Sequence, residues 1–413
     1  MINIGLPSVK WDWTNNMQEK IDEILTRGIS EVIGLDHVRE RLLSGKILRI
    51  KFGIDPTSPN IHLGRSVPLL KLRDLQELGH QIVFIVGDFT GVIGDTSDKE
   101  SERPMLLQEA VNANMQSYLK QVAKILDMEK VEVHYNSEWL GELCYSEIGE
   151  HADQFSVAEF IARDNIKKRL EEGKRVSLRE MLYPLMQGYD SVAVKADVEI
   201  GGNDQRFNIL AGRKLQAHYK QIPQDIFLTN LILGTDGRKM SSSWGNTINL
   251  LDTVQDIFGK VMSIPDDVVI DYFIHCTRVS MQEIAQIAEG IVTGTLNPRD
   301  AKLRLAKEIV TLYHSAKDAK EAEKYFIDTF SKKEMPTNVQ EIIVRIHEKY
   351  SDAIAENGLA ESKSDARRKI EQRGVSLEGE KLFVDALISE TDNGKILKVG
   401  KKDFVRIVIG EKK

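Results

Sequence analysis

The chain has 413 residues, of which 41% are hydrophobic and 29% charged, and its formal net charge is −7. This length predicts two or three domains, and the composition is that of an ordinary globular protein. The negative charge excludes a chain that is basic throughout, so any nucleic-acid contact must come from a local patch. Two distant cysteines, Cys144 and Cys276, exclude a disulfide framework and a four-cysteine zinc site, and they fit a reducing cytoplasm.

Nothing in the sequence predicts a membrane segment. The N-terminus lacks a basic stretch followed by an apolar core, so we expect no signal peptide. No run of about 18 apolar residues occurs, so no transmembrane helix is expected either. We therefore expect a cytoplasmic protein without a membrane partner.

The first hundred residues predict a βαβ unit. Residues 14–45 carry a helical spacing of apolar residues, and 47–54 read as a buried strand. A turn with two prolines leads into a helical pattern over 61–78, and 81–87 is another apolar run of strand length. Strand, turn, helix and strand imply a parallel sheet.

The middle of the chain predicts helices and a second α/β stretch. Residues 105–195 are mainly helical, with a strand at 131–135. A helix at 207–218 follows, and then strands at 225–229 and 230–233. We expect an α/β fold, a Rossmann-like doubly wound parallel sheet with a helical insertion.

The remainder predicts two further domains. Residues 251–334 are helical with charged faces, and Pro336 suggests a linker. Residues 338–413 form a compact α+β module whose positive and negative charges roughly balance. The predicted domains are therefore 1–250, with its insertion at about 105–195, then 251–334, and then 338–413.

A first chemical motif, Asp55-Pro-Thr-Ser-Pro-Asn-Ile-His-Leu-Gly-Arg65, lies at the predicted strand-to-helix junction. Open α/β sheets bind ligands at such carboxyl ends of strands, and the N–H groups of a helix N-terminus favour phosphate. His62 and Arg65 share a helical face, and Gly64 between them lets a flat ring approach the backbone. Taken alone, the pattern also describes a capped helix with a surface histidine.

A second motif is the glycine-rich loop at 234–243, Gly-Thr-Asp-Gly-Arg-Lys-Met-Ser-Ser-Ser. It carries Lys239 beside three serine hydroxyls. A mobile loop of this kind can close over a triphosphate and neutralise the leaving pyrophosphate. Taken alone, it also describes a solvated turn.

Together, the two loops resemble the paired signatures His-Ile-Gly-His and Lys-Met-Ser-Lys-Ser of class I aminoacyl-tRNA synthetases. Tyr183-Pro-Leu-Met-Gln-Gly-Tyr-Asp190 and Gly201-Gly-Asn-Asp-Gln205, which lie between the loops, are similar to the amino-acid and ribose motifs of tyrosyl-tRNA synthetases. Residues 94–103 match that family as well, and 362–375 resemble an S4-type RNA-binding module. The resemblance extends from about residue 30 to the end.

The resemblance implies a tyrosine site. Asp95, Tyr183 and Gln187 would accept hydrogen bonds from the ammonium, and Gln205 would lie close to the reacting carboxyl. Asp190 would accept the phenolic hydrogen bond. Since a buried carboxylate without a partner is costly, this contact would reject phenylalanine.

The resemblance also implies an ATP site without a covalent nucleophile, in which the tyrosine carboxylate attacks the α-phosphate in line. The phosphates would lie between Thr57, His62 and Arg65 on one side and Lys99, Arg103 and Lys239 on the other. The other ATP-binding residues would be Gly64, Gly202, Asp204, Met240, Ser241 and Ser242. Mg²⁺ would come with the triphosphate; we expect no protein metal site and no tightly bound cofactor.

Three positions depart from the family pattern. Arg65 replaces a histidine but keeps positive charge and donors, whereas Ser242 replaces a lysine. Cations that could compensate for that loss are Lys99, Arg103 and Arg238. Lys51 stands where many family members place a tyrosine that contacts the substrate phenol, and it could pair with Asp190 or point away.

The remaining expectations concern tRNA(Tyr) and assembly. A basic helix would grip RNA phosphates through Lys363, Arg367, Arg368, Lys369 and Arg373. The helical stretch 251–334 would contact the anticodon arm by analogy. Members of the family are homodimers across the insertion, so we expect a homodimer here.

Three other readings stay open. The related tryptophan enzyme shares the class I core, although Asp190 in its motif argues against it. A noncatalytic RNA-binding paralogue would share the fold, but Asp95, Asp204 and Lys239 are intact. A small-molecule adenylyltransferase would share the first motif but not the second loop.

Overall fold

The computed structural model describes residues 17–95, 105, 107–331, 339–400 and 403–410. The chain divides into two compact units, residues 1–320 and 321–413. The predicted linker at Pro336 lies outside the described residues. Within the described part of the chain, no helix is long and apolar enough to cross a membrane.

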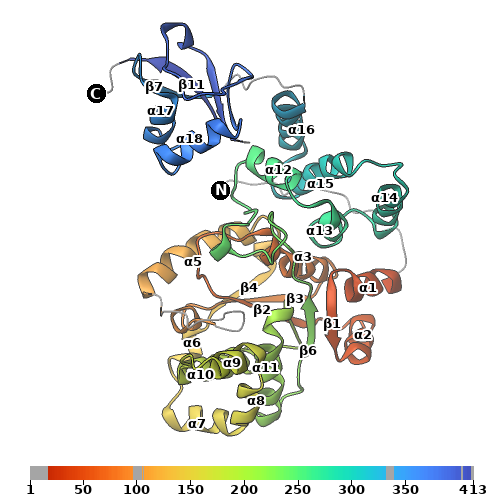
Figure 1. Ribbon diagram of the computed structural model, residues 1–413. Coiled ribbons are helices and arrows are strands. Elements are labelled where there is room, and N and C mark those ends of the chain that lie inside the picture. The colour runs from red at the N-terminus through yellow and green to blue at the C-terminus, as the bar shows by residue number, and fades with distance from the viewer. Residues whose placement is uncertain (1–16, 96–104, 106, 332–338, 401–402, 411–413) are drawn as a thin grey trace. The chain divides into compact units, whose positions relative to one another are not determined.

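The first unit is built on a six-stranded sheet in the order β1-β6-β5-β2-β3-β4 (Figure 1). The strands are β1 (Ile29–Ile33), β2 (Arg49–Ile54), β3 (Gln81–Val86), β4 (Val131–Tyr135), β5 (Val198–Gly202) and β6 (Asp225–Thr229). Neighbouring strands are parallel, except that β1 pairs antiparallel with β6. The chain order reverses between β2 and β5, and such a switch point is where sheets of this type bind ligands.

Three helices fix the residues around this switch point. They are α3 (Leu63–Glu77), α10 (Leu178–Ala193) and α11 (Arg206–His218). α3 packs against β3 and β5, and α11 packs against β5 and α10. Ser177 begins α10 with a capping box that includes Glu180, and this cap sets where the helix starts.

Further helices belong to the first unit or begin in it. Those that precede or belong to the insertion are α1 (Met17–Thr26), α2 (Leu35–Leu43), α4 (Thr90–Ile93), α5 (Gln108–Val122), α6 (Ser137–Leu140), α7 (Tyr145–Asp153), α8 (Val157–Ile161) and α9 (Asp164–Glu171). A helical series follows, with α12 (Val254–Met262), α13 (Val269–Cys276), α14 (Met281–Thr293), α15 (Pro298–Tyr313) and α16 (Ala316–Phe326). The boundary between the two units falls inside α16.

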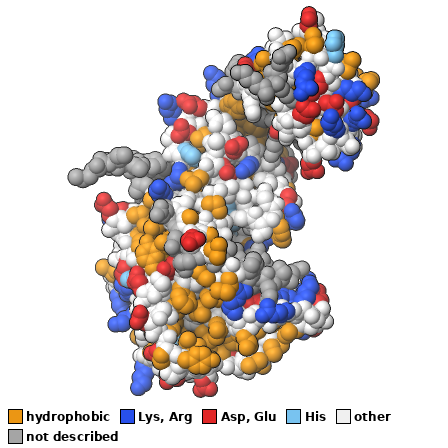
Figure 2. Space-filling view, turned by 90° about the vertical axis from the view of Figure 1, so that its left-hand side faces the viewer, with side chains coloured by type: hydrophobic (Ala, Val, Ile, Leu, Met, Phe, Trp, Pro, Cys, Tyr) orange, Lys and Arg blue, Asp and Glu red, His pale blue; other side chains and the backbone are white. Residues whose placement is uncertain are grey.

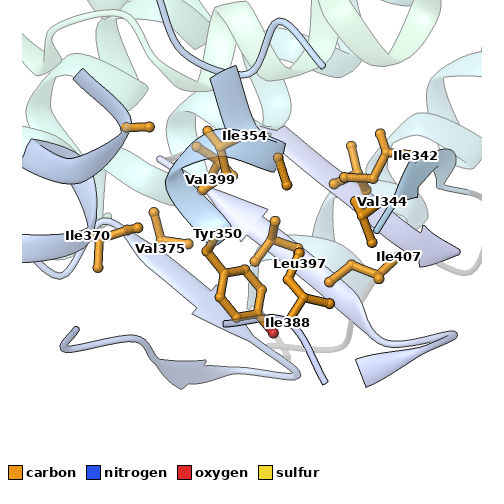
Figure 3. Packing of buried hydrophobic residues seen from close by; sticks show 13 residues of the cluster. Ile342, Val344, Tyr350, Ile354, Ile370, Val375, Ile388, Leu397, Val399 and Ile407 are labelled. Atoms are coloured by element: carbon orange, nitrogen blue, oxygen red, sulfur yellow. The ribbon is translucent and has the colours of Figure 1, made fainter. Parts of the chain in front are cut away.

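The second unit is a small α+β module. Its strands are β7 (Gln340–Val344), β8 (Val375–Leu377), β9 (Glu380–Lys381), β10 (Ile396–Val399) and β11 (Asp403–Ile409), in the order β7-β11-β10-β8-β9. Two helices, α17 (Tyr350–Glu356) and α18 (Lys363–Glu371), pack against each other. Figure 3 shows Tyr350 and Ile354 from α17 and Ile370 from α18 in one apolar core with Leu397 and Ile407 from the sheet. This module therefore has a core of its own.

Some local predictions were wrong. The helix predicted over 14–45 is interrupted by β1, which lies between Gly28 and Gly34, both at positive φ. β1 is an edge strand whose partner, β6, lies almost 200 residues further along the chain, so local spacing could not reveal it. β5 was not predicted as a strand, and 230–233 leave the sheet rather than forming another.

Candidate active site

A cavity of about 430 Å³ opens at the carboxyl ends of β2, β3, β5 and β6. Fifteen predicted site residues line it, namely Thr57, His62, Gly64, Arg65, Asp95, Tyr183, Gln187, Asp190, Gly202, Asp204, Gln205, Lys239, Met240, Ser241 and Ser242. Lys99 and Arg103 lie outside the described residues. The fold therefore gathers into one cavity residues that are as much as 185 positions apart (57 to 242) in the sequence.

One end of the cavity is organised around Asp55, which directly follows β2. Its Oδ2 accepts a 2.8 Å hydrogen bond from the Tyr183 hydroxyl, and its Oδ1 accepts one of 2.7 Å from Thr90 Oγ1. A side chain at Gly87 would place its Cβ 2.0 Å from Asp55 Oδ1, so only glycine fits there. Burial raises the pKa of the Tyr183 hydroxyl well above its ordinary value, with the charge of Asp55 adding to the effect. Sequence reasoning gave Asp55 no role, although its place after a buried strand was a usable signal.

Asp190 lies in the wall of the same end and is 3% exposed. Its Oδ1 accepts a 2.8 Å hydrogen bond from Trp139 Nε1, and its Oδ2 accepts one of 3.3 Å from Asn136 Nδ2. Burial raises the pKa of Asp190 to about 7, against the opposing effects of the Lys51 charge and of these two hydrogen bonds. Neither Trp139 nor Asn136 was predicted as a site residue, because the short segment that follows β4 carries no recognisable motif.

Asp95 and Gln205 also meet in the cavity. Gln205 Nε2 donates to Asp95 Oδ2 over 2.7 Å, and Asn208 Nδ2 donates to Gln205 Oε1 over 3.1 Å. The carboxylate thus orients the amide, because it can only accept from the NH₂ group. Asn208, from the first turn of α11, was not predicted.

His62 is the N-cap residue of α3 and is 7% exposed. Burial lowers its pKa to about 3, with the charges of Arg65 and Lys239 adding to the effect, so the imidazole is neutral at physiological pH. Its Nδ1 is buried without a hydrogen-bond partner among the described residues. A Cβ at Gly64 would lie 3.1 Å from the imidazole Cε1 and Nδ1, so glycine leaves the ring its space.

Arg65 extends along the cavity wall from the first turn of α3. Its guanidinium donates to the Tyr118 hydroxyl and, over 3.4 Å, to Thr57 Oγ1. Thr57 and Arg65 are thereby brought together, as the first motif predicted for phosphate contact. Tyr118, which is fully buried, was not predicted.

The glycine-rich loop at 234–243 closes as a tight turn, in which the Gly234 amide donates to the Arg238 carbonyl over 2.7 Å. Lys239 Nζ lies 2.9 Å from Asp204 Oδ2. Arg238 instead pairs with Asp236 and lies over the ring of Trp244, 4.8 Å from its centroid. It does not line the cavity, so the structure does not place it to compensate for the lysine that Ser242 replaces.

Six described residues were predicted to bind tyrosine, and Lys51 is the one among them that does not line the cavity. It is completely buried and pairs with Glu199, 2.9 Å away, rather than with Asp190. Lys51 and Glu199 are register neighbours on the parallel strands β2 and β5, which brings the two side chains together beneath α10.

The five predicted RNA-contacting residues gather on α18 and just beyond it. They form ion pairs with neighbouring acids: Lys363 with Asp352, Arg367 with Asp385, and Arg368 and Lys369 with Asp365. Arg373 lies over the ring of Phe383, 5.3 Å from its centroid. Phe383 is 65% exposed and was not predicted.

Comparisons with known proteins agree with this geometry. The model of the family described as tRNA synthetases class I (W and Y) matches residues 44–331. The tyrosine–tRNA ligase of Moorella thermoacetica is 42% identical over 390 residues, covering 93% of this chain and 94% of that protein. That of Thermotoga maritima is 41% identical over 392 residues, covering 95% and 98%.

Solved structures match the fold. A C-terminally truncated mitochondrial tyrosyl-tRNA synthetase from Aspergillus nidulans aligns with a TM-score of 0.63 and 24% identity, covering 75% of this chain and 94% of that one. The tyrosyl-tRNA synthetase from Archaeoglobus fulgidus complexed with L-tyrosine aligns with a TM-score of 0.60 and 24% identity, covering 75% and 100%. These matches confirm the predicted fold class.

Proposed function

Because the chain belongs to the class I tRNA synthetases, within the tyrosine–tRNA ligases, we propose that tyrosine, ATP and the 3′ end of tRNA meet in the cavity of its first unit. The enzyme activates L-tyrosine with ATP to tyrosyl-adenylate and releases pyrophosphate; a hydroxyl of the terminal ribose of tRNA then takes the tyrosyl group and AMP leaves. The family match and the tyrosine–tRNA ligase relatives confirm the family that the two loops resemble. The observation that carries the proposed site is the convergence of both loops and the Tyr183–Asp190 segment on one cavity.

The tyrosine would lie between Asp190 and Asp95. The proton of the Tyr183 hydroxyl is already donated to Asp55, so the Tyr183 oxygen is left as an acceptor, which is what an ammonium needs. Asp95 and Gln187 would supply the other acceptors. At the side-chain end of the bound tyrosine, Asp190 would accept the phenolic hydrogen bond, and phenylalanine would leave this buried carboxylate without that partner.

The triphosphate would lie along Thr57, His62 and Arg65, with Lys239 opposite and the ribose against Gly202 and Asp204. The tyrosine carboxylate attacks the α-phosphorus. A bond forms between a carboxylate oxygen and that phosphorus, and the bond from the phosphorus to the pyrophosphate oxygen breaks. Neutral His62 can donate one N–H to the developing phosphate charge, and Arg65 and Lys239 add positive charge. The side chains position and stabilise, and none forms a covalent intermediate.

Magnesium would reach this site with the triphosphate. Among the described residues, no group of three His, Cys, Asp or Glu side chains could hold a metal ion. The described part of the chain therefore offers no metal site of its own, and we assign no step to the metal. Phosphate oxygens are ligands that Mg²⁺ ordinarily takes.

We further infer that the second unit is an S4-like module that grips tRNA(Tyr) through α18, with the helices after residue 250 contacting the anticodon arm. The basic residues of α18 are largely exposed. Two of them form ion pairs outside the helix, Lys363 with Asp352 and Arg367 with Asp385. Exposed ion pairs cost little to exchange for phosphate oxygens. The substrates ATP, tyrosine and tRNA support a cytoplasmic location.

A homodimer through the insertion is supported by its apolar surface. Figure 2 shows hydrophobic side chains gathered on the lower part of the face it presents, where Figure 1 draws the insertion helices. An apolar hollow of about 60 Å³ in this region is lined by residues that include Leu140, Leu143, Ile148 and Met186. Leu143→Asp is expected to yield a monomer in light scattering, whereas Val292→Asp, at an exposed position on α14, should stay dimeric.

Pyrophosphate exchange tests the active-site assignment. Purified protein should exchange pyrophosphate into ATP far more efficiently with tyrosine than with phenylalanine or tryptophan. Asp190→Ala should lose the preference for tyrosine while the fold, measured by circular dichroism, is retained. Exchange with none of the three amino acids would overturn the catalytic assignment, and an unchanged preference in the variant would overturn the role of Asp190.

A further inference from the structure

A buried ion pair lies directly beneath the proposed phenol site. Lys51 on β2 and Glu199 on β5 are 0% and 2% exposed, and Lys51 Nζ lies 2.9 Å from Glu199 Oε1. Their strands are the two that meet at the switch point of the sheet. The pair therefore lies at the centre of the fold, where Lys51 stays out of the cavity wall and Glu199, 2% exposed, borders the cavity.

Both charges bind the same two residues of α10. Lys51 Nζ donates to the Gln187 carbonyl over 2.9 Å and to Ser191 Oγ over 2.7 Å. Glu199 accepts from Ser191 Oγ over 3.1 Å and from Gln187 Nε2 over 3.4 Å, and also from Gln224. Gln187 and Ser191 stand on either side of Asp190 in the helix, so the pair clamps the turn that carries this carboxylate.

Stability alone does not account for such a pair. Desolvating two charges costs several kcal/mol each, and apolar residues of similar size often stabilise a core as well or better. Here the pair also places one positive and one negative charge near Asp190, a carboxyl group whose charge state decides how strongly it accepts a hydrogen bond. The contribution of the pair is therefore to be sought in selectivity.

We propose that Lys51 and Glu199 form a positioning pair for tyrosine selection: the pair fixes the turn around Asp190, and the Lys51 charge favours the charged form of this carboxylate, which accepts the phenol. The proposal rests on the proposed function, in which Asp190 receives the phenolic hydrogen bond. Lys51 lies outside the cavity wall, and Glu199 is only 2% exposed within it. Their effect passes through Asp190.

The two partners act on Asp190 in opposite senses. Burial raises the pKa of Asp190, the Lys51 charge lowers it, and the Glu199 charge raises it. The segment after β4 adds neutral donors, Trp139 and Asn136, with His134 beyond the indole ring at 5.7 Å between centroids. On α10 itself the hydroxyl of Tyr183, which donates to Asp55, feels the charge of Asp190. Removing Lys51 should therefore favour protonated Asp190, and removing Glu199 should favour the charged form.

The test compares Lys51→Met with Glu199→Gln. Tyrosine-dependent and phenylalanine-dependent kcat/KM are measured in pyrophosphate exchange from pH 6 to 9, and their ratio is taken, because titration of ATP and of the amino-acid amine cancels in it. Lys51→Met should lower the tyrosine-to-phenylalanine ratio about tenfold at pH 7 and move the midpoint of its acid limb to higher pH. Glu199→Gln should move that midpoint to lower pH.

A purely structural pair predicts a different pattern. Both single variants would then lose selectivity in the same direction with an unmoved midpoint, and that result would overturn the proposal. Glu180→Gln is the matched control, because Glu180 on α10 forms another buried pair, with Arg169 on α9; each side chain is 1% exposed and neither lines the cavity. It should lower the melting temperature and leave the midpoint unchanged.

The possible outcomes distinguish a failure of this proposal from a failure of the proposed function. If Lys51→Met does not fold, the direction of the Glu199→Gln shift decides the proposal by itself. If the wild type shows no tyrosine preference, the proposed role of Asp190 fails. If the preference is present and is lost in Asp190→Ala, while Lys51→Met and Glu199→Gln leave the midpoint in place, only the positioning role fails.

Discussion

The Nζ of Lys239 lies 2.9 Å from Oδ2 of Asp204, and this ion pair joins the glycine-rich loop to the turn that follows β5. The side chains are 30% and 23% exposed, so solvent screens the pair and little free energy holds it. In the proposed reaction the lysine turns to the phosphates and the carboxylate to the ribose. The ion pair thus marks where the two ends of ATP would be bound.

Lys239→Ala should reduce kcat for tyrosine-dependent pyrophosphate exchange by about 100-fold, the scale for removing one charge-stabilising donor from a transition state. The KM for tyrosine should change little, because Lys239 lies at the phosphate end. Arg238→Ala is the control, since that guanidinium pairs with Asp236 on the same loop outside the cavity wall. Equal losses in both variants would argue against a phosphate role that is specific to Lys239.

His62 should make the protein less stable in acid. Its pKa is lowered from 6.5 to about 3 in the fold, so its contribution is fully present above pH 6.5 and is lost as the pH falls towards 3. Between pH 7 and 5, His62→Gln should lose about 1–2 kcal/mol less unfolding free energy than the wild type. Urea unfolding at both pH values measures this, with His218→Gln, at an exposed position, as the control. Identical losses in wild type and His62→Gln would contradict a buried neutral imidazole.

Asp190→Asn should raise the free energy of unfolding at alkaline pH and lower the selectivity for tyrosine. Burial raises the pKa of Asp190 from 3.8 to about 7, so the stability it contributes is fully present below pH 3.8 and is lost as the pH rises through 7. At pH 8 the variant should be more stable than the wild type by on the order of 2 kcal/mol. It should also discriminate poorly against phenylalanine. A variant that is less stable than the wild type at both pH 5 and pH 8 would refute this account of the carboxylate.

Neutralising α18 should weaken tRNA binding without touching amino-acid activation. Arg367→Ala combined with Arg368→Ala should raise the KM for tRNA about tenfold at 0.15 M salt and reduce the salt dependence of binding by about two ionic contacts. Pyrophosphate exchange should stay unchanged, because these residues lie in the second unit. An unchanged KM for tRNA would count against the S4-like assignment.

The sequence by itself predicted fifteen of the residues that line the cavity, and it predicted the order of β2, α3 and β3. Hydrophobic runs at β2 and β3 and the helical pattern of α3 are local signals, because burial of a strand or of one helix face depends on nearby residues. The spacing of Tyr183, Gln187 and Asp190 likewise fixes them on one face of α10, and all three line the cavity. The family resemblance joined these local signals to a reaction.

Only the tertiary structure decided which atoms meet. β1 reads as helix because its hydrogen-bond partner β6, although adjacent in the sheet, lies almost 200 residues further along the chain. Asp55, Trp139 and Asn136 carry no motif, yet they hold Tyr183 and Asp190 by hydrogen bonds between distant segments. Lys51 turned to Glu199 rather than Asp190, because parallel pairing of β2 and β5 brings a carboxylate to the buried ammonium. Pairings across a sheet depend on register and burial, which no window of local sequence contains.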